Sequence, residues 1–310
     1  MSHNSIAVYG HRGWASSKVV SALAASSAPI KVLYRSGSDI SSLPSNVAKI
    51  EVDVNDEAAL VAALQGIDIV ISLVGHEGVT RQHAFIKAIP KTAVKLFSPS
   101  DLAARYEEEG LRIGVNAEKD AVEKAAQEAG IPTTVVLTGN FAEFAINTYA
   151  LGVDYPGNRI IFTGESATQP INLCTRDYVG AAYASIFAST PISQLSNRCI
   201  GLSELKPTGN EIADAFEKKH GRAPLKVVHS SEKIDAEVKT GLEEKNPFTL
   251  AFYCRKIWGS GKQVGMVGKD LWEVEGYEKS SLEDLILKGK LGQYRPMPPP
   301  VLEFFEAGFR

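Results

Sequence analysis

A glycine-rich loop follows the first apolar run of the chain, Ile6 to Tyr9. Its residues are Gly10, His11, Arg12, Gly13, Trp14, Ala15 and Ser16. Backbone N–H groups at a helix start can bind a pyrophosphate where glycines permit a tight turn and close approach. Gly10 and Gly13 suit these tasks, and Ser16 replaces a third small residue. The loop therefore predicts a dinucleotide site, although bare strand–glycine–helix turns share the pattern.

The second apolar run ends in a cation where an NAD site would carry an acid. The segment is Leu33-Tyr34-Arg35-Ser36. An acidic residue at this point accepts from the ribose 2′-hydroxyl of NAD, whereas arginine suits the 2′-phosphate of NADP. Arg12 could reach the same phosphate. We therefore expect NADP(H) to be the cofactor; the alternative is that Arg35 is a solvated charge at a strand end.

Lys119 shares a helical face with apolar residues. The spacing that places it there is Val115, Lys119, Val122, Ala126, Ala129. An inward lysine must find a partner or border a polar cleft, because an unpaired buried charge is strongly disfavoured. Lys119 would then bind the nicotinamide ribose, or donate to a carbonyl oxygen as hydride arrives. The alternative is a solvated lysine that pairs with Glu123 one turn away.

Polar and small residues follow three further apolar runs. Gly75 is expected to permit close backbone approach to the cofactor, and Ser98 to lie near the nicotinamide. Asn140 and Phe141 would border the nicotinamide, or else form a turn and a core ring. His76 and His83 lack the spacing of a common zinc pair, so no metal is predicted.

These residues require a parallel sheet to bring them together. Apolar runs alternate with helix-period segments through the first half, which is typical of α/β folds. Expected strands are Ser5 to Tyr9, Ile30 to Tyr34, Ala48 to Val52, Ile67 to Leu73, Val94 to Phe97 and Thr133 to Leu137. Helices are expected from about Trp14, Asp56, Thr80, Gly114 and Phe141.

The regular alternation of apolar runs and helix-period segments ends at about residue 150. We expect a strand over 158–163 and helices over 176–188 and 208–220, the last with a capping box at Thr208 and Glu211. The segment from Phe248 to Trp272 is rich in aromatic residues. The prediction is a doubly wound Rossmann-type α/β sheet with an NADP-binding domain over 1–150. Residues 151–310 would form a smaller substrate-binding lobe that partly returns to the sheet.

Composition excludes several classes of protein. A net charge of −3 over 310 residues offers no field for nucleic acid or an anionic membrane. No apolar run reaches the ~20 residues of a membrane helix, and no signal peptide is evident. Three cysteines without CxxC spacing fit a reducing compartment, so a cytoplasmic location is expected. A homodimer or a protein partner stays open.

Several motifs carry a resemblance to a known family. They are the G-x-x-G loop, Leu33-Tyr34-Arg35, Phe97-Ser98-Pro99-Ser100-Asp101-Leu102, Lys119 eleven residues before Gly130-Ile131-Pro132, Gly139-Asn140-Phe141 and Thr175-Arg176-Asp177-Tyr178-Val179-Gly180. The chain thus resembles the NmrA-like and isoflavone-reductase-like branch of the atypical short-chain dehydrogenases up to about residue 225. Departures are Ser16 for a third glycine and Asp101-Leu102-Ala103 where plant reductases have Glu-Phe-Gly.

The resemblance implies an NADP-binding Rossmann domain and a lysine, matching Lys119, near the nicotinamide. The Tyr-x-x-x-Lys pair of ordinary short-chain dehydrogenases is absent. We expect an NADPH-dependent reductase of a small, largely apolar and aromatic substrate, bound between the nicotinamide edge and the segment Phe248 to Trp272. The alternative, by family analogy, is an NADP(H)-sensing regulator without turnover.

Overall fold

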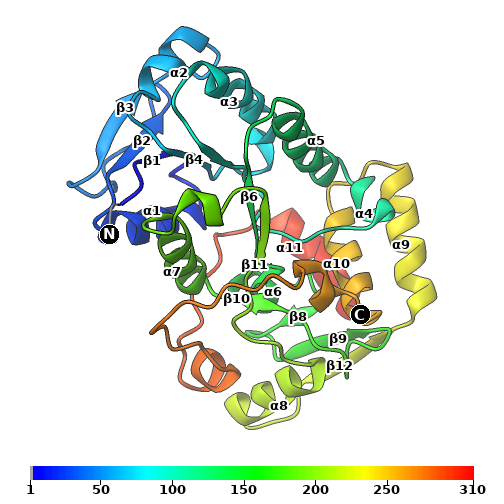
Figure 1. Ribbon diagram of the computed structural model, residues 1–310. Coiled ribbons are helices and arrows are strands. Elements are labelled where there is room, and N and C mark those ends of the chain that lie inside the picture. Colours follow the sequence, from blue (N-terminus) through cyan, green and yellow to red (C-terminus); the bar gives the residue numbers. More distant parts are fainter. Residues whose placement is uncertain (1–2) are drawn as a thin grey trace.

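A parallel sheet forms the first half of the protein in the computed structural model, which describes residues 3–310 (Figure 1). The strand order is β3-β2-β1-β4-β5, and each neighbouring pair is parallel. The strands are β1 Ile6–Tyr9, β2 Ile30–Tyr34, β3 Ala48–Glu51, β4 Ile69–Ser72 and β5 Leu96–Ser98. The order reverses between β1 and β4, and in such sheets this crevice binds the ligand.

Two further strands extend the sheet. Strand β6 (Thr134–Leu137) pairs in parallel with β11 (Arg198–Gly201), and a parallel bridge between Phe97 and Thr133 connects β6 to β5. Helix α7 (Arg176–Phe187) packs on α1 (Ser16–Ala25), as Figure 1 shows. Elements from beyond residue 150 therefore complete the first sheet.

Helices cover both faces of the sheet because successive residues of each strand are apolar and point to opposite faces. Ile6 and Val8 of β1 face a core that includes α1 and α7, whereas Ala7 and Tyr9 face the opposite core. The helices of the second face are α2 Glu57–Ala63, α3 Gln82–Ala88 and α5 Gly114–Glu128. The predicted doubly wound Rossmann-type fold is confirmed.

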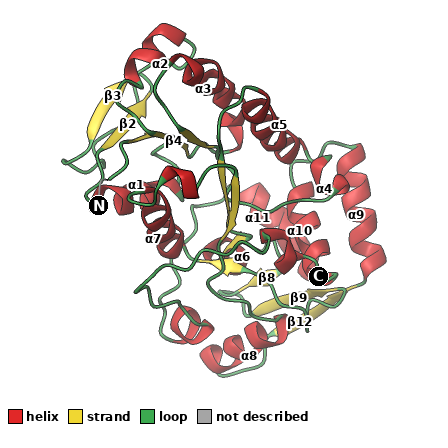
Figure 2. Cartoon of the chain, in the orientation of Figure 1, coloured by secondary structure: helices red, strands yellow, loops and turns green. Residues whose placement is uncertain are grey.

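A second core lies in the lobe, seen below the sheet in Figure 2. Its three-stranded sheet has the order β12-β9-β8, with β8 antiparallel to β9. Its strands are β8 Val153–Asp154, β9 Arg159–Thr163 and β12 Leu225–His229; its helices are α6 Ala142–Asn147, α8 Gly209–His220, α9 Ser231–Glu243, α10 Thr249–Gly259 and α11 Pro299–Glu306. Thr208 and Glu211 form the predicted capping box of α8.

Short elements connect these parts. They are the parallel pair β7 Asn140–Phe141 and β10 Leu173–Cys174, the helix α4 Glu108–Leu111, the 3-10 helices η1 His76–Arg81, η2 Ile89–Lys91, η3 Ile192–Gln194, η4 Gln263–Val267 and η6 Ala307–Phe309, and the π-helical turn η5 Glu283–Leu287. The helix expected from about Thr80 therefore begins as 3-10 helix. Within residues 3–310, no helix combines the length and apolar character needed to cross a membrane.

The aromatic segment packs differently from our expectation. The Tyr253 and Trp258 side chains are fully buried, and Phe248 stacks on Phe304 of α11 at 4.4 Å between ring centroids. The Trp272 indole instead donates to Ser185 of α7. Phe248, Tyr253 and Trp258 thus pack in hydrophobic cores, since composition alone does not fix which way a ring faces.

Candidate functional site

The glycine loop is built so that only glycine fits its first position. Gly10 has φ +97°, and a Cβ atom there would lie 2.7 Å from the backbone carbon of Leu73. At Gly13 a Cβ would lie 2.6 Å from the Ser16 Oγ atom, which donates to the Gly13 carbonyl oxygen. Ser16 begins α1 and is buried. The loop therefore passes against the end of β4 and turns directly into a helix, as a pyrophosphate cradle requires.

Three loop side chains have different surroundings. The His11 ring is buried, with its Nε2 atom 3.1 Å from the carbonyl oxygen of Asp39. Arg12 is exposed. Hydrogen bonds from Ser41 lower the pKa of Asp39, and the charge of Arg12 lowers it further. The Trp14 ring contacts Phe141 edge-on at 5.3 Å, and Ala15 precedes α1.

Arg35 lies in the turn that follows β2, and its side chain is exposed. Within residues 3–310, neither Arg12 nor Arg35 forms a salt bridge. Both guanidinium groups are therefore available to an anion beside the glycine loop.

Lys119 faces inward from α5, and its side chain is only 13% exposed. Its Nζ atom donates to the backbone carbonyl oxygen of Asp101 at 2.6 Å, and 3.9 Å separates it from the Asp101 Oδ1 atom. Burial lowers the pKa of Lys119, and the Asp101 charge opposes this effect. The alternative partner Glu123 binds Arg105 instead. The solvated-lysine interpretation is therefore wrong, although Ala129 of the same stripe is exposed at the helix end.

Asp101 is held in place by an unusual backbone. The next residue, Leu102, has φ +53°, a left-handed conformation that costs free energy for a residue other than glycine. The Leu102 N–H donates to the carbonyl oxygen of Val136, and the Thr138 hydroxyl donates to the carbonyl oxygen of Leu102. Burial raises the pKa of Asp101 against the charges of Lys119 and Arg105. A cavity of about 60 Å³ lies beside these side chains.

Residues at the carboxyl ends of β4 and β5 lie along the sheet edge between the glycine loop and Asp101. A Cβ at Gly75 would meet nothing within 4 Å, so the space beside it is open. The Ser100 hydroxyl donates to the Val74 carbonyl oxygen at 2.7 Å and connects the two strand ends. Ser98 is fully buried, and its Oγ atom has no hydrogen-bond partner among residues 3–310. Partial burial lowers the pKa of His76, and the charges of Lys119 and Arg295 lower it further.

Asn140 and Phe141 form β7, directly after β6. Asn140 is mostly buried and pairs with Leu173 of β10, while the Phe141 ring packs on Trp14. The predicted residues after β1, β2, β4, β5 and β6 thus gather at the carboxyl edge of one parallel sheet, and Lys119 reaches that region from α5 through Asp101. The glycine cradle, the open space at Gly75 and two free arginines fit an NADP molecule.

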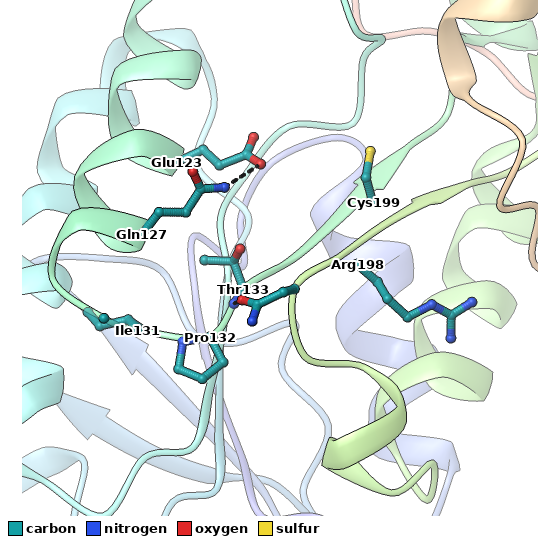
Figure 3. A pocket seen from close by; sticks show the side chains of 9 residues that line it. Glu123, Gln127, Ile131, Pro132, Thr133, Arg198 and Cys199 are labelled. Atoms are coloured by element: carbon teal, nitrogen blue, oxygen red, sulfur yellow. Dashed lines mark hydrogen bonds between the residues drawn. The ribbon is translucent and has the colours of Figure 1, made fainter.

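One hollow lies at the opposite edge of the sheet (Figure 3). It measures about 400 Å³ and is bordered by Thr133 and Arg198, which precede or begin strands β6 and β11. Its charged groups already have partners, since Glu123 binds Arg105 and Arg198 binds Asp270. Nothing in this hollow calls for an anionic or cationic ligand, so we place the candidate site at the carboxyl edge.

A buried acid, which the sequence patterns did not single out, lies beside the glycine loop. Glu143 of α6 is only 4% exposed; its Oε1 atom accepts from the Arg176 backbone N–H at 3.0 Å, and its Oε2 atom has no partner among residues 3–310. Burial raises its pKa to about 7. The Arg176 guanidinium lies over the Trp14 ring, 4.3 Å from its centroid. One isolated acid in an apolar helix was the only signal.

The fold and the loop together define a Rossmann-type nucleotide-binding protein. The NmrA-like family model matches residues 2–250, and the chain belongs to the NmrA-like family, which confirms the resemblance. An isoflavone reductase homologue from Zea mays is 27% identical over 237 residues, which cover 70% of this chain and 74% of the relative.

Solved structures share the fold. A structure titled as an isoflavone reductase has a TM-score of 0.76 at 20% identity, covering 93% of this chain and all of the other. The binary complex of leucoanthocyanidin reductase and NADPH from Vitis vinifera has a TM-score of 0.70 at 22% identity, covering 98% of this chain and 99% of the other. The likeness therefore extends beyond residue 250, where the family model ends.

Proposed function

We propose that this chain is an NADPH-dependent reductase of a small aromatic, enone or carbonyl substrate, with Lys119 at the reacting oxygen. The observation that carries the proposal is the nearly buried Lys119 ammonium, which lies near the edge of the sheet that holds the glycine loop. The relatives named as isoflavone reductase, and the neighbour solved with NADPH, support this reaction class and this cofactor.

The cofactor would be held by the predicted residues. The backbone of Gly10 to Ala15 would bind the pyrophosphate, and Arg12 and Arg35 would neutralise the 2′-phosphate. Gly75, Ser98, Asn140 and Phe141 would border the rest of the dinucleotide. NADPH, when bound, supplies a hydride to the substrate.

Lys119 has the properties that such a reduction requires. One N–H of its ammonium donates to Asp101, which leaves two N–H groups for a substrate oxygen. A positive charge in a partly dry site stabilises the negative charge that develops on that oxygen as the carbon is reduced. Because burial lowers the pKa of Lys119, proton donation from Nζ is easier than from a solvated lysine. Asp101 keeps the amine oriented.

The proposal is tested by following NADPH fluorescence and absorbance while enones, quinones and aryl aldehydes are added. We expect Lys119→Ala to reduce kcat/KM about 10²- to 10⁴-fold with little change in the NADPH dissociation constant. Lys124→Ala is the control, since that lysine is exposed on the same helix and pairs with Asp120. Tight NADPH binding without oxidation of any substrate in the panel would contradict a reductase and favour the sensing regulator.

A further inference from the structure

A strap near the C-terminus crosses from the lobe to the glycine loop. The strap is Leu291 to Met297, the orange-red loop that leads into α11 in Figure 1. Leu291 and Met297 pack against the core of the lobe, and the Asn147 side chain donates to the Gly292 carbonyl oxygen at 3.1 Å. Both ends of the strap are therefore fixed to the lobe. It lies beyond the residues matched by the family model.

The middle of the strap rests on the glycine loop. The Trp14 Nε1–H donates to the carbonyl oxygen of Gln293 at 3.0 Å. The Tyr294 ring meets the Trp14 ring at 4.8 Å and the Phe144 ring at 5.3 Å, edge-on in each case. A hydrogen bond and an aromatic pair thus join the strap to the loop that we expect to hold the pyrophosphate.

The next residue of the strap is an unpaired cation. Arg295 is exposed, and no carboxylate within residues 3–310 lies within salt-bridge distance of it. Its charge nevertheless acts on His76, the residue that opens the helix after β4. The Arg295 guanidinium lies over the Tyr294 ring, 5.6 Å from its centroid, which keeps it beside the loop after β1, and its charge lowers the pKa of His76 in the loop after β4. These two loops flank the crevice where the strand order reverses.

We propose that Arg295 binds the pyrophosphate of the dinucleotide, so that the strap closes the cofactor site from the side of the lobe. The inference rests on the proposed binding of NADP. A dinucleotide lies across the crevice between β1 and β4, and its pyrophosphate carries the charge nearest the glycine loop. A guanidinium can donate two parallel N–H groups to phosphate oxygens, which adds geometric selectivity to charge.

The test measures NADPH dissociation constants of the full chain by calorimetry for wild type, Arg295→Ala and Arg295→Lys. We expect Arg295→Ala to weaken NADPH binding about tenfold or more, and Arg295→Lys to recover part of the loss. Lys290→Ala is the matched control, because Lys290 is an exposed cation just before the strap that pairs with Asp284. Its dissociation constant should stay within about twofold of wild type. Equal melting temperatures would show that each variant is folded.

A comparison of two ligands distinguishes which phosphate group of the dinucleotide Arg295 contacts. Adenosine 2′-monophosphate carries the 2′-phosphate of NADPH but neither phosphate of the pyrophosphate, so Arg295→Ala should leave its binding within about twofold of wild type. An equal loss for both ligands would assign Arg295 to the 2′-phosphate and overturn the inference. An unchanged NADPH dissociation constant would also overturn it, and a raised KM for anionic substrates alone would then assign Arg295 to the substrate. If wild type binds no NADPH, the proposed function fails as well.

Discussion

The Lys119 Nζ atom donates to the backbone carbonyl oxygen of Asp101, and the carboxylate of the same aspartate lies 3.9 Å from that nitrogen. One residue therefore orients the amine through its main chain and acts on its charge through its side chain. The two effects can be separated, since Asp101→Asn removes the charge and retains the carbonyl oxygen.

We predict that Asp101→Asn moves the alkaline limb of the kcat/KM profile to lower pH. The carboxylate charge favours protonated Lys119, so its removal lowers the pKa of the lysine further, and the acid form is lost earlier as pH rises. The measurement is a pH profile of NADPH oxidation. Glu118→Gln, an exposed neighbour on α5, is the control and should keep the wild-type profile. An unshifted limb in Asp101→Asn would exclude proton donation by Lys119.

Gly10→Ala should damage both the fold and the cofactor site. Its φ of +97° and a Cβ position 2.7 Å from the Leu73 backbone leave no room for a methyl group. We expect a loss of at least about 1 kcal/mol in the free energy of unfolding, together with loss of NADPH binding. Denaturant titration and calorimetry measure the two effects.

Gly75→Ala is the comparison for this glycine, because a Cβ there meets nothing within 4 Å. We expect wild-type stability with weakened NADPH binding, since the methyl group would occupy the open space. If Gly75→Ala binds NADPH as tightly as wild type, that space does not belong to the cofactor.

Arg35→Ala should change the choice between the two cofactors. Loss of a guanidinium beside the 2′-phosphate is expected to weaken NADPH binding about tenfold and to leave NADH binding within about twofold. Titrations with both cofactors give the ratio. Lys49→Ala removes an exposed cation from the neighbouring strand β3 and should not alter it. An identical ratio in Arg35→Ala and wild type would reject the assignment of Arg35.

Glu143→Gln should remove a pH dependence of stability. The pKa of Glu143 is about 7 in the folded chain and 4.5 in an ordinary environment, so the folded state retains a proton that the unfolded state has lost. Stability therefore falls as pH rises from about 4.5 to 7, by on the order of 3 kcal/mol.

The glutamine variant stays neutral and can still accept from the Arg176 N–H. We expect it to be more stable than wild type at pH 8 and nearly equal at pH 5, measured by urea unfolding. The control is Glu118→Gln, which should follow wild type at both values. A parallel pH dependence in Glu143→Gln and wild type would contradict the raised pKa.

The sheet could be predicted because strands covered on both faces are nearly continuous apolar runs. The run Ile30 to Tyr34 matches β2, and Gly114 begins α5 as expected. The inward face of Lys119 followed from helical spacing with Val122 and Ala126, which are both buried. These features depend on local periodicity, which the sequence displays directly.

Long-range contacts could not be predicted in this way. The hydrogen bond between Trp14 and Gln293 joins residues 279 positions apart, and no periodicity connects them. Glu143 is an ordinary acid in the sequence, and only the packing of α6 against the start of α7 buries it. The same limit applies to Phe248 and Trp258, whose rings fill cores because of where α11 and β9 lie.

The return of α7 and β11 to the first sheet has a consequence for fragments of this chain. A polypeptide ending at residue 150 would lack the helix that covers α1 and the strand that pairs with β6. Its apolar helix face would meet water, and its open strand edge would offer unpaired amides to other copies. Such a fragment should aggregate when expressed alone, because residues 176–201 supply the elements that cover it.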